Sequence, residues 1–248
     1  MSKRIFITGA SSGIGKATAF AMNKDGYELI LAGRREDRLK DLANELQVPT
    51  KILVFDISNK EETKLAYESL PEEWKQIDIL INNAGNAHGF ESIHEGNTED
   101  WDKMMDINVK GLLYITRLIS PGMVKRNSGH IINLSSTAGK FVYPNGGVYC
   151  ASKFAVEALT QGMRMDFNPY HIKVSSIAPG AVNTEFSNVR FKGDQERADK
   201  VYEGFQPLLA EDIAEVIRYM IEAPAHVNLA DITIMPTAQA SFNLINRN

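Results

Sequence analysis

The sequence contains few of the residues that mark disulfide-bonded, metal-binding or membrane proteins. Its single cysteine, Cys150, cannot form an internal disulfide, and none of its five histidines stands four residues from another. No apolar run approaches the roughly 18 residues that a membrane-spanning helix needs. The N-terminus leads directly into a strand-like run without a signal-peptide pattern. We therefore expect a cytoplasmic protein with no metal site and no membrane contact.

An excess of positive charge is also lacking. The chain has 27 Lys and Arg residues against 31 Asp and Glu, a formal net charge of −4, which argues against a nucleic-acid partner. Its 248 residues are 44% hydrophobic and 23% charged, values typical of soluble globular proteins. A chain of this length can bury a substantial core. The composition favours a folded protein of enzyme size.

Short runs of β-branched and aliphatic residues alternate with stretches of helical period along the whole chain. This alternation predicts the α/β class, with a doubly wound parallel sheet of about seven strands and helices on both faces. No linker-like stretch or repeat interrupts it, so we expect a single domain over 1–248. The predicted strands are 4–8, 28–32, 51–55, 77–81, 130–134, 173–177 and 231–235.

The segment 183–206 departs from this alternation because it is polar and charged. It follows the sixth predicted strand and the Pro179-Gly180 turn. In a doubly wound sheet this places it outside the carboxyl ends of the strands, where ligands bind. We therefore expect a substrate lid at about 183–206. The alternative is an ordinary pair of surface helices.

A glycine-rich run, TGASSGIG, links the first predicted strand to the following helix. Gly9, Gly13 and Gly15 permit a tight turn and a close approach of the backbone to a ligand. The free N–H groups at the start of the helix can then bind a pyrophosphate. The spacing TGxxxGxG differs from the GxGxxG of ordinary dinucleotide-binding proteins.

Further motifs follow in chain order: Asp56, NNAG at 82–85, Asn108 in NVKG, Ser136 in LSSTAG, Tyr149 with Lys153, and Pro179-Gly180. With the glycine run, this series resembles the short-chain dehydrogenase/reductase family over nearly the whole chain. The resemblance implies a Rossmann-type dinucleotide-binding and catalytic domain that moves a hydride between a nicotinamide and an alcohol or carbonyl carbon. It implies cofactor contacts from Gly9, Ser11, Ser12, Gly13, Ile14, Gly15, Arg34, Arg35, Asp56, Ile57, Asn83, Ala84, Gly85, Tyr149, Lys153, Pro179, Gly180, Val182 and Thr184.

Two adjacent arginines follow the second predicted strand, where an NAD-binding protein usually has an acidic residue. Arg34 and Arg35 can both form charge-assisted hydrogen bonds to a 2′-phosphate. They therefore favour NADP(H) over NAD(H) as the cofactor. The alternative is that they begin a surface helix and pair with Glu36 and Asp37.

Tyr149 and Lys153 stand four residues apart on a segment of helical period, so they share one face. A phenol, which ordinarily titrates near pH 10, needs a nearby cation to act as a base near neutral pH. The resemblance makes Ser136 the residue that binds the substrate oxygen, with Ser135 as the competing choice. It makes Asn108 the holder of a water in a proton relay, the alternative being an asparagine bonded to its own helix backbone. Cys150 lies about 100° around the helix from Tyr149 and is expected in the packing.

The runs TEFSNVRFKGD at 184–194 and PAHVN at 224–228 resemble the family branch that oxidises serine, 3-hydroxyisobutyrate and related short 3-hydroxy acids with NADP. A small acid needs a cation for its carboxylate, and Arg190 and Lys192 are available in the predicted lid. We expect Ser136, Tyr149 and Arg190 to contact the substrate.

Two alternatives to the 3-hydroxy acid assignment remain open. One is a reductase of neutral aldehydes, ketones or diketones, in which the lid cations are merely solvated. The other is a non-catalytic protein that senses NADP. The resemblance also implies a homotetramer built on the helices around Asn108 and Tyr149.

Overall fold

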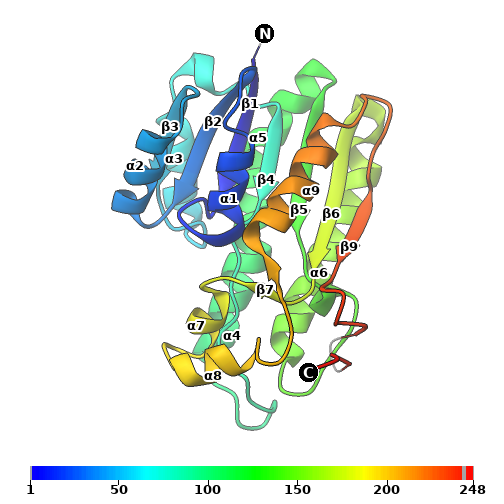
Figure 1. Ribbon diagram of the computed structural model, residues 1–248. Coiled ribbons are helices and arrows are strands. Elements are labelled where there is room, and N and C mark those ends of the chain that lie inside the picture. Colours follow the sequence, from blue (N-terminus) through cyan, green and yellow to red (C-terminus); the bar gives the residue numbers. More distant parts are fainter. Residues whose placement is uncertain (1, 242–243, 248) are drawn as a thin grey trace.

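Seven strands form one parallel sheet in the order β3-β2-β1-β4-β5-β6-β9 (Figure 1). The computed structural model describes residues 2–241 and 244–247. Because the strands are parallel, all their carboxyl ends meet at one edge, which faces the lower half of Figure 1. The strands are β1 (Lys3–Thr8), β2 (Tyr27–Gly33), β3 (Thr50–Val54), β4 (Ile79–Asn82), β5 (Gly129–Leu134), β6 (Ile172–Pro179) and β9 (Asp231–Ile234).

Helices cover both faces of this sheet, with α1 and α9 in front and α5 and α6 behind in Figure 1. Successive strand residues point to opposite faces. Ile5 and Ile7 therefore pack with α1, α2 and α9, whereas Phe6 joins a second core with α3, α5 and α6. The helices are α1 (Gly13–Ala21), α2 (Glu36–Glu45), α3 (Lys60–Glu68), α4 (Thr98–Met105), α5 (Leu112–Arg126), α6 (Gly147–Phe167) and α9 (Ala210–Glu222).

The predicted α/β class, with a doubly wound parallel sheet of about seven strands, is confirmed. The strand boundaries differ from the prediction by one or two residues. The fourth strand begins at Ile79 because the N–H of Ile77 still belongs to a turn and donates to the carbonyl of Lys75 at 3.0 Å. The last strand ends at Ile234, shortly before Pro236, which cannot donate to a sheet.

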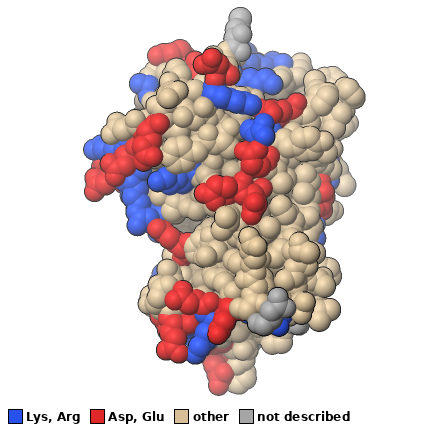
Figure 2. Space-filling model, in the orientation of Figure 1, with Lys and Arg blue, Asp and Glu red and all other residues tan. Residues whose placement is uncertain are grey.

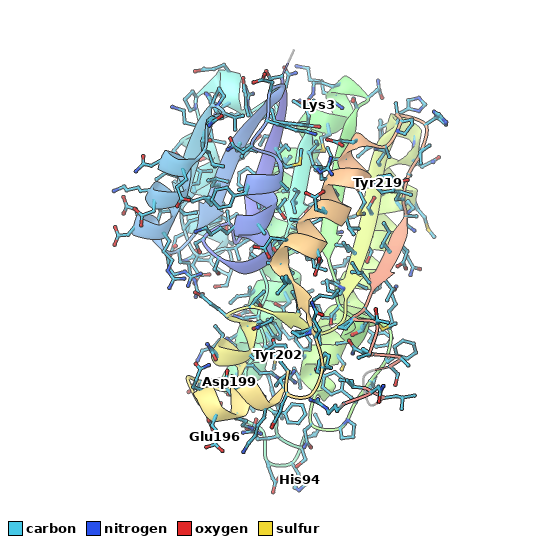
Figure 3. The ribbon with its side chains drawn as sticks, in the orientation of Figure 1. Lys3, His94, Glu196, Asp199, Tyr202 and Tyr219 are labelled. Atoms are coloured by element: carbon cyan, nitrogen blue, oxygen red, sulfur yellow. The ribbon has the colours of Figure 1, made fainter. Side chains whose placement is uncertain are left out.

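The polar segment after β6 forms two short helices between two short strands. Strands β7 (Val182–Asn183) and β8 (Leu208–Leu209) pair in parallel and frame α7 (Phe186–Arg190) and α8 (Gln195–Lys200). The sequence did not predict β7 and β8, because two residues are too few to show a strand period. The Tyr202 hydroxyl donates to the carbonyl of Val182 at 2.8 Å and ties the segment to β7 (Figure 3).

No helix in the described residues is both long and apolar enough to span a bilayer. Residues 2–241 and 244–247 also contain no group of three or more His, Cys, Asp or Glu side chains positioned to hold a metal ion. On the face shown in Figure 2, charged side chains cluster over α2 and over the α7–α8 segment.

One polar side chain, that of His130 on β5, is buried in the sheet far from any cluster of charge. Its Nε2 lies 2.9 Å from the Ser175 hydroxyl, which in turn donates to Asn228. Burial, together with smaller effects of the Lys173 and Lys3 cations, lowers the pKa of His130 from 6.5 to about 3. The folded protein therefore holds this imidazole neutral.

We expect His130→Gln to make the protein more resistant to acid. With a pKa of 6.5 unfolded and about 3 folded, the unfolded state binds more protons below pH 6.5, so the wild-type free energy of unfolding falls as the pH decreases. This contribution reaches roughly 2 kcal/mol at pH 5. Urea unfolding of both proteins at pH 7 and pH 5 measures it, with the exposed His94→Gln as the control. If the free energy of unfolding depended on pH equally in wild type and His130→Gln, the low folded pKa assigned to His130 would be wrong.

Candidate active site

A cavity of about 610 Å³ lies at the carboxyl ends of the strands, within the size range of small-molecule sites. It is lined by the glycine turn after β1, the end of β2, the NNAG turn after β4, the loop after β5, the start of α6 and the segment from β6 to Tyr202. Of the residues predicted for the site, all but Gly15 and Asn108 line it. The structure therefore brings together motifs from the whole length of the chain.

The glycine turn is joined directly to the NNAG turn. The Thr8 hydroxyl accepts from the backbone N–H groups of Asn83 and Ala84, both at 2.9 Å, and donates to Ile81. Gly9 adopts a positive φ of 65°, which favours glycine. Gly15 faces the carbonyl of Gly9 so closely that a Cβ would collide with it. Gly15 thus shapes the turn from behind rather than lining the cavity.

Tyr149 and Lys153 lie on the same side of α6, as predicted, with Lys153 Nζ 6.0 Å from the centre of the Tyr149 ring. Both side chains are buried. The Lys153 ammonium donates to the carbonyl of Leu134 at 2.8 Å, which fixes its position at the end of β5.

The electrostatics of this pair are dominated by burial. Burial raises the pKa of Tyr149, an effect increased by Tyr143 and opposed by a hydrogen bond with Ser136 and by the Arg190 cation. Burial also lowers the pKa of Lys153 to about 8, while Glu157 acts in the opposite direction. Burial therefore favours the neutral form of both side chains, the phenol of Tyr149 and the amine of Lys153.

Ser136 is held at the start of a short 3-10 turn, where its hydroxyl accepts from the N–H of Ala138 at 3.1 Å. It also forms the hydrogen bond that influences the pKa of Tyr149. The hydroxyl of the competing residue, Ser135, is buried against Gly139 and has no hydrogen-bond partner among the described residues. The geometry thus favours Ser136 over Ser135 as the residue available to a substrate oxygen. Cys150 is buried in the packing, with Sγ 3.7 Å from the carbonyl of Phe141.

Asn108 lies in a π-helical turn, Asp106–Gly111, between α4 and α5. Its amide does not bond its own helix backbone in the way that the alternative interpretation proposed. Instead it accepts from the N–H of Asn86 at 2.8 Å and donates to the carbonyl of Asn86 and to the Ser152 hydroxyl. A Cβ on Gly85 would lie 3.2 Å from Asn108 Oδ1 and 3.3 Å from Lys153 Nζ, so both atoms lie close to this glycine. Asn108 braces the loop beside Lys153 from outside the cavity lining.

Arg34 and Arg35 both line the cavity where β2 ends. In the described ion pairs Glu36 binds Lys40, and neither Glu36 nor Asp37 pairs with these arginines. Arg34 instead lies 3.4 Å from Asp56. The alternative in which both arginines pair with the start of their own helix therefore does not describe this structure.

Arg190 ends α7 and reaches into the cavity, with only 8% of the residue exposed. Its guanidinium lies 4.7 Å from the ring centre of Phe90 and 5.6 Å from those of Tyr143 and Tyr149. Nη2 has no hydrogen-bond partner among the described residues. Lys192, the other predicted cation, is 58% exposed in its side chain, pairs with Asp100 at 2.7 Å and does not line the cavity.

The sequence analysis missed several residues that line the cavity. Tyr143 carried no motif, although an aromatic residue just before the Tyr149 helix was a usable signal, and Phe186 lay in the TEFSNVRFKGD run without being assigned a contact. Gln239 accepts from the N–H of Ala181 at 2.9 Å and supports the turn after β6, a contact 58 residues apart that no local pattern indicates. The other unpredicted lining residues include Asn86, Phe191, Val201, Tyr202, Ile245 and Arg247.

Known proteins resemble this chain over nearly its full length. An NADP-dependent 3-hydroxy acid dehydrogenase, YdfG, of Escherichia coli (strain K12) is 43% identical over 241 residues, which cover 97% of each chain. Sulfoacetaldehyde reductase 2 of Chromohalobacter salexigens is 40% identical over 243 residues, covering 97% of this chain and 96% of the relative. The solved closed form of serine dehydrogenase complexed with NADP+ superposes with a TM-score of 0.94 at 42% identity, covering 99% of both chains.

The model of the short chain dehydrogenase family matches residues 3–195. This range contains the glycine turn, Ser136, Tyr149, Lys153 and Arg190. The chain belongs to the short-chain dehydrogenase family.

Proposed function

We propose that this protein is an NADP(H)-dependent oxidoreductase that transfers a hydride between the nicotinamide and the carbinol carbon of a small 3-hydroxy acid. The observation that carries the substrate class is the buried guanidinium of Arg190, which lies beside Tyr149 and whose Nη2 has no hydrogen-bond partner within the described part of the chain. A buried cation without an acidic partner is costly, and an anionic substrate would compensate it. The names of the relatives agree, since a 3-hydroxy acid and sulfoacetaldehyde both carry an anionic group.

The residues around the cavity fit a dinucleotide cofactor. Gly9 and Gly13 line the cavity, both with positive φ, and the free N–H groups at the start of α1 suit a pyrophosphate. Arg34 and Arg35 stand at the cavity edge, where they suit the 2′-phosphate of NADP(H). Pro179 and Gly180 also line the cavity, as do Tyr149 and Lys153. When bound there, NADP+ supplies the acceptor for the hydride.

The protein's own residues handle the oxygen and its proton. We assign Tyr149 as the base that takes the hydroxyl proton in oxidation and returns it in reduction. Ser136, which shares a hydrogen bond with Tyr149, holds the substrate oxygen. Lys153 stabilises the phenolate and passes the proton on, and Asn108 positions the loop beside it for a relay through water. Arg190 binds the carboxylate and so orients the carbinol carbon.

Three further assignments complete the proposal. The α7–α8 segment acts as a substrate lid over about 183–206 within one domain spanning 1–248, because it supplies Arg190 and Tyr202 to the cavity. The protein works in the cytoplasm. It assembles as a homotetramer through α5 and α6, whose surfaces leave Leu113, Phe154 and Met165 exposed, since exposed apolar side chains of this kind are common at subunit contacts.

Replacement of Tyr149 by phenylalanine tests the proton-transfer step. The ring and its packing against Phe186, with 5.6 Å between ring centres, would remain while the hydroxyl is lost. We expect kcat for serine oxidation with NADP+ to fall by ~100-fold or more. Turnover is followed by the absorbance of reduced cofactor, with Tyr219→Phe on the outer face of α9 as the control (Figure 3). Near-normal turnover in Tyr149→Phe would refute the mechanism.

Lys153→Met is expected to abolish turnover yet stabilise the fold at neutral pH. The folded pKa of Lys153 is about 8 against 10.5 unfolded, so below pH 8 the folded protein bears the full cost of a buried ammonium. This cost declines as the pH rises from 8 to 10.5. After allowance for the lost hydrogen bond to Leu134, we expect a gain of about 2 kcal/mol at pH 7.

Urea unfolding at pH 7 and pH 10 measures this effect, with the exposed Lys64→Met as the control. The gain should shrink at pH 10. A less stable Lys153→Met protein at pH 7, or a gain of equal size at both pH values, would contradict the interpretation.

The carboxylate role of Arg190 is tested with a matched pair of substrates, 3-hydroxyisobutyrate and its neutral methyl ester. Loss of a buried charge-assisted contact costs about 2 to 5 kcal/mol. We therefore expect Arg190→Met to lower kcat/KM for the acid by at least ~30-fold and for the ester by no more than ~3-fold. Lys192→Met is the control and should leave the acid-to-ester ratio unchanged. Equal losses on both substrates would favour a reductase of neutral carbonyl compounds instead.

A further inference from the structure

An acidic residue of the α7–α8 segment reaches across to the arginines of the cofactor site. Glu185, which directly precedes α7, binds Arg35 through one carboxylate oxygen at 2.8 Å and Arg38 through the other at 2.6 Å. The two arginines lie 150 and 147 residues away in the sequence. Figure 2 shows both signs of charge side by side in this region, between α2 and α7.

Arg35 is the centre of this network. Its Nε lies 3.1 Å from the Ser11 hydroxyl and its Nη2 lies 2.5 Å from the Ser12 hydroxyl, both in the glycine turn. With Nη1 bound to Glu185, three of its five N–H groups are engaged, one on each nitrogen. A phosphate that binds Arg35 on the Nη1 side therefore has to share this nitrogen with the Glu185 carboxylate or replace that carboxylate.

The charges around this point nearly cancel. Arg34, Arg35 and Arg38 supply three positive charges, and Asp56 and Glu185 supply two negative ones in direct ion pairs with them. Arg35 and Arg38 lower the pKa of Glu185, so its carboxylate stays ionised at neutral pH. Glu185 therefore reduces the electrostatic attraction between these arginines and a dianionic 2′-phosphate.

We propose that Glu185 competes with the 2′-phosphate of the cofactor for Arg35 and thereby determines how strongly the protein prefers NADP(H) over NAD(H). This inference rests on the proposed NADP(H) function. The side chain of Glu185 is 45% exposed, so its competition is of modest strength. NAD(H) lacks the 2′-phosphate, and its binding is independent of this competition.

The same contact links the cofactor to the substrate. Glu185 is followed by Phe186, whose ring packs against Tyr149, and α7 ends at Arg190. A phosphate that replaces Glu185 at Arg35 leaves the carboxylate bound to Arg38 alone, which weakens the connection between α2 and the helix that carries these two side chains. Glu185 is thus a specificity-determining residue placed between the cofactor and the proposed lid.

The test measures the affinity of wild type and Glu185→Gln for adenosine 2′,5′-bisphosphate and for 5′-AMP, two probes that differ only in the 2′-phosphate. We expect the Kd of the bisphosphate to fall by ~2- to 5-fold in Glu185→Gln, with the Kd of 5′-AMP unchanged. The gain should largely disappear in ~1 M salt, where exposed charges are screened. Isothermal titration at two salt concentrations gives all of these values.

The matched control is Glu196→Gln. Glu196 lies on α8 at the outer edge of the segment (Figure 3), has an 80% exposed side chain and pairs only with Lys200 among the described ion pairs. Glu196→Gln removes the same charge from the same segment as Glu185→Gln, so a comparison of the two variants isolates the effect of position. An unchanged or weaker affinity for the bisphosphate in Glu185→Gln overturns the inference, as does an equal gain for both probes or in both variants.

The wild-type values separate this inference from the function on which it rests. If wild type binds the bisphosphate no better than 5′-AMP, the proposed preference for NADP(H) fails. If wild type prefers the bisphosphate and Glu185→Gln leaves that preference unchanged, only the role of Glu185 fails. Thermal unfolding of both variants establishes that each is folded at the temperature of the titration.

Discussion

The reversal of strand order between β1 and β4 is the constraint on which the site depends. The chain runs outward from β1 through β2 to β3 and then returns to pair β4 with the other side of β1. Connections on the two sides leave the sheet in opposite directions, so a crevice opens at the carboxyl ends of this strand pair. Thr8 joins the two strand ends there through its hydrogen bonds to Ile81, Asn83 and Ala84. Both halves of the cavity are therefore held in register by the sheet itself.

The polar side chains of Tyr149 and Lys153 lie in this crevice and are shielded from water there. Burial raises the pKa of Tyr149 and lowers that of Lys153, so it favours the neutral form of each. A tyrosine that takes up a proton as its phenolate needs a lowered pKa, and in this structure Ser136 and Arg190 act in that direction but do not outweigh burial. The site is thus a balance between desolvation and a few directed contacts. Such a balance reduces the stability of the fold in exchange for reactivity.

The sequence predicted the sheet and the placement of Tyr149 and Lys153 on one side of a helix because both depend on local patterns. The core strands have continuous aliphatic runs, and Tyr149 and Lys153 are one helical turn apart. The partners of Arg35 could not be predicted in this way. Glu36 and Asp37 are its neighbours in sequence, yet Arg35 binds Glu185, 150 residues away. Such contacts depend on how the segment after β6 folds back over the sheet, which no residue periodicity encodes.

The two groups of arginines at the cavity differ in what surrounds them. At its edge, Arg34, Arg35 and Arg38 are exposed and paired with carboxylates, and ion pairs of this kind are weak and easily exchanged. Inside, Arg190 is buried against aromatic rings without an acidic partner among the described residues, which is an expensive arrangement. The carboxylates at the edge can therefore be exchanged for another anion at little cost. No carboxylate among the described residues pairs with Arg190, so the anionic substrate proposed above would offset the cost of burying its charge.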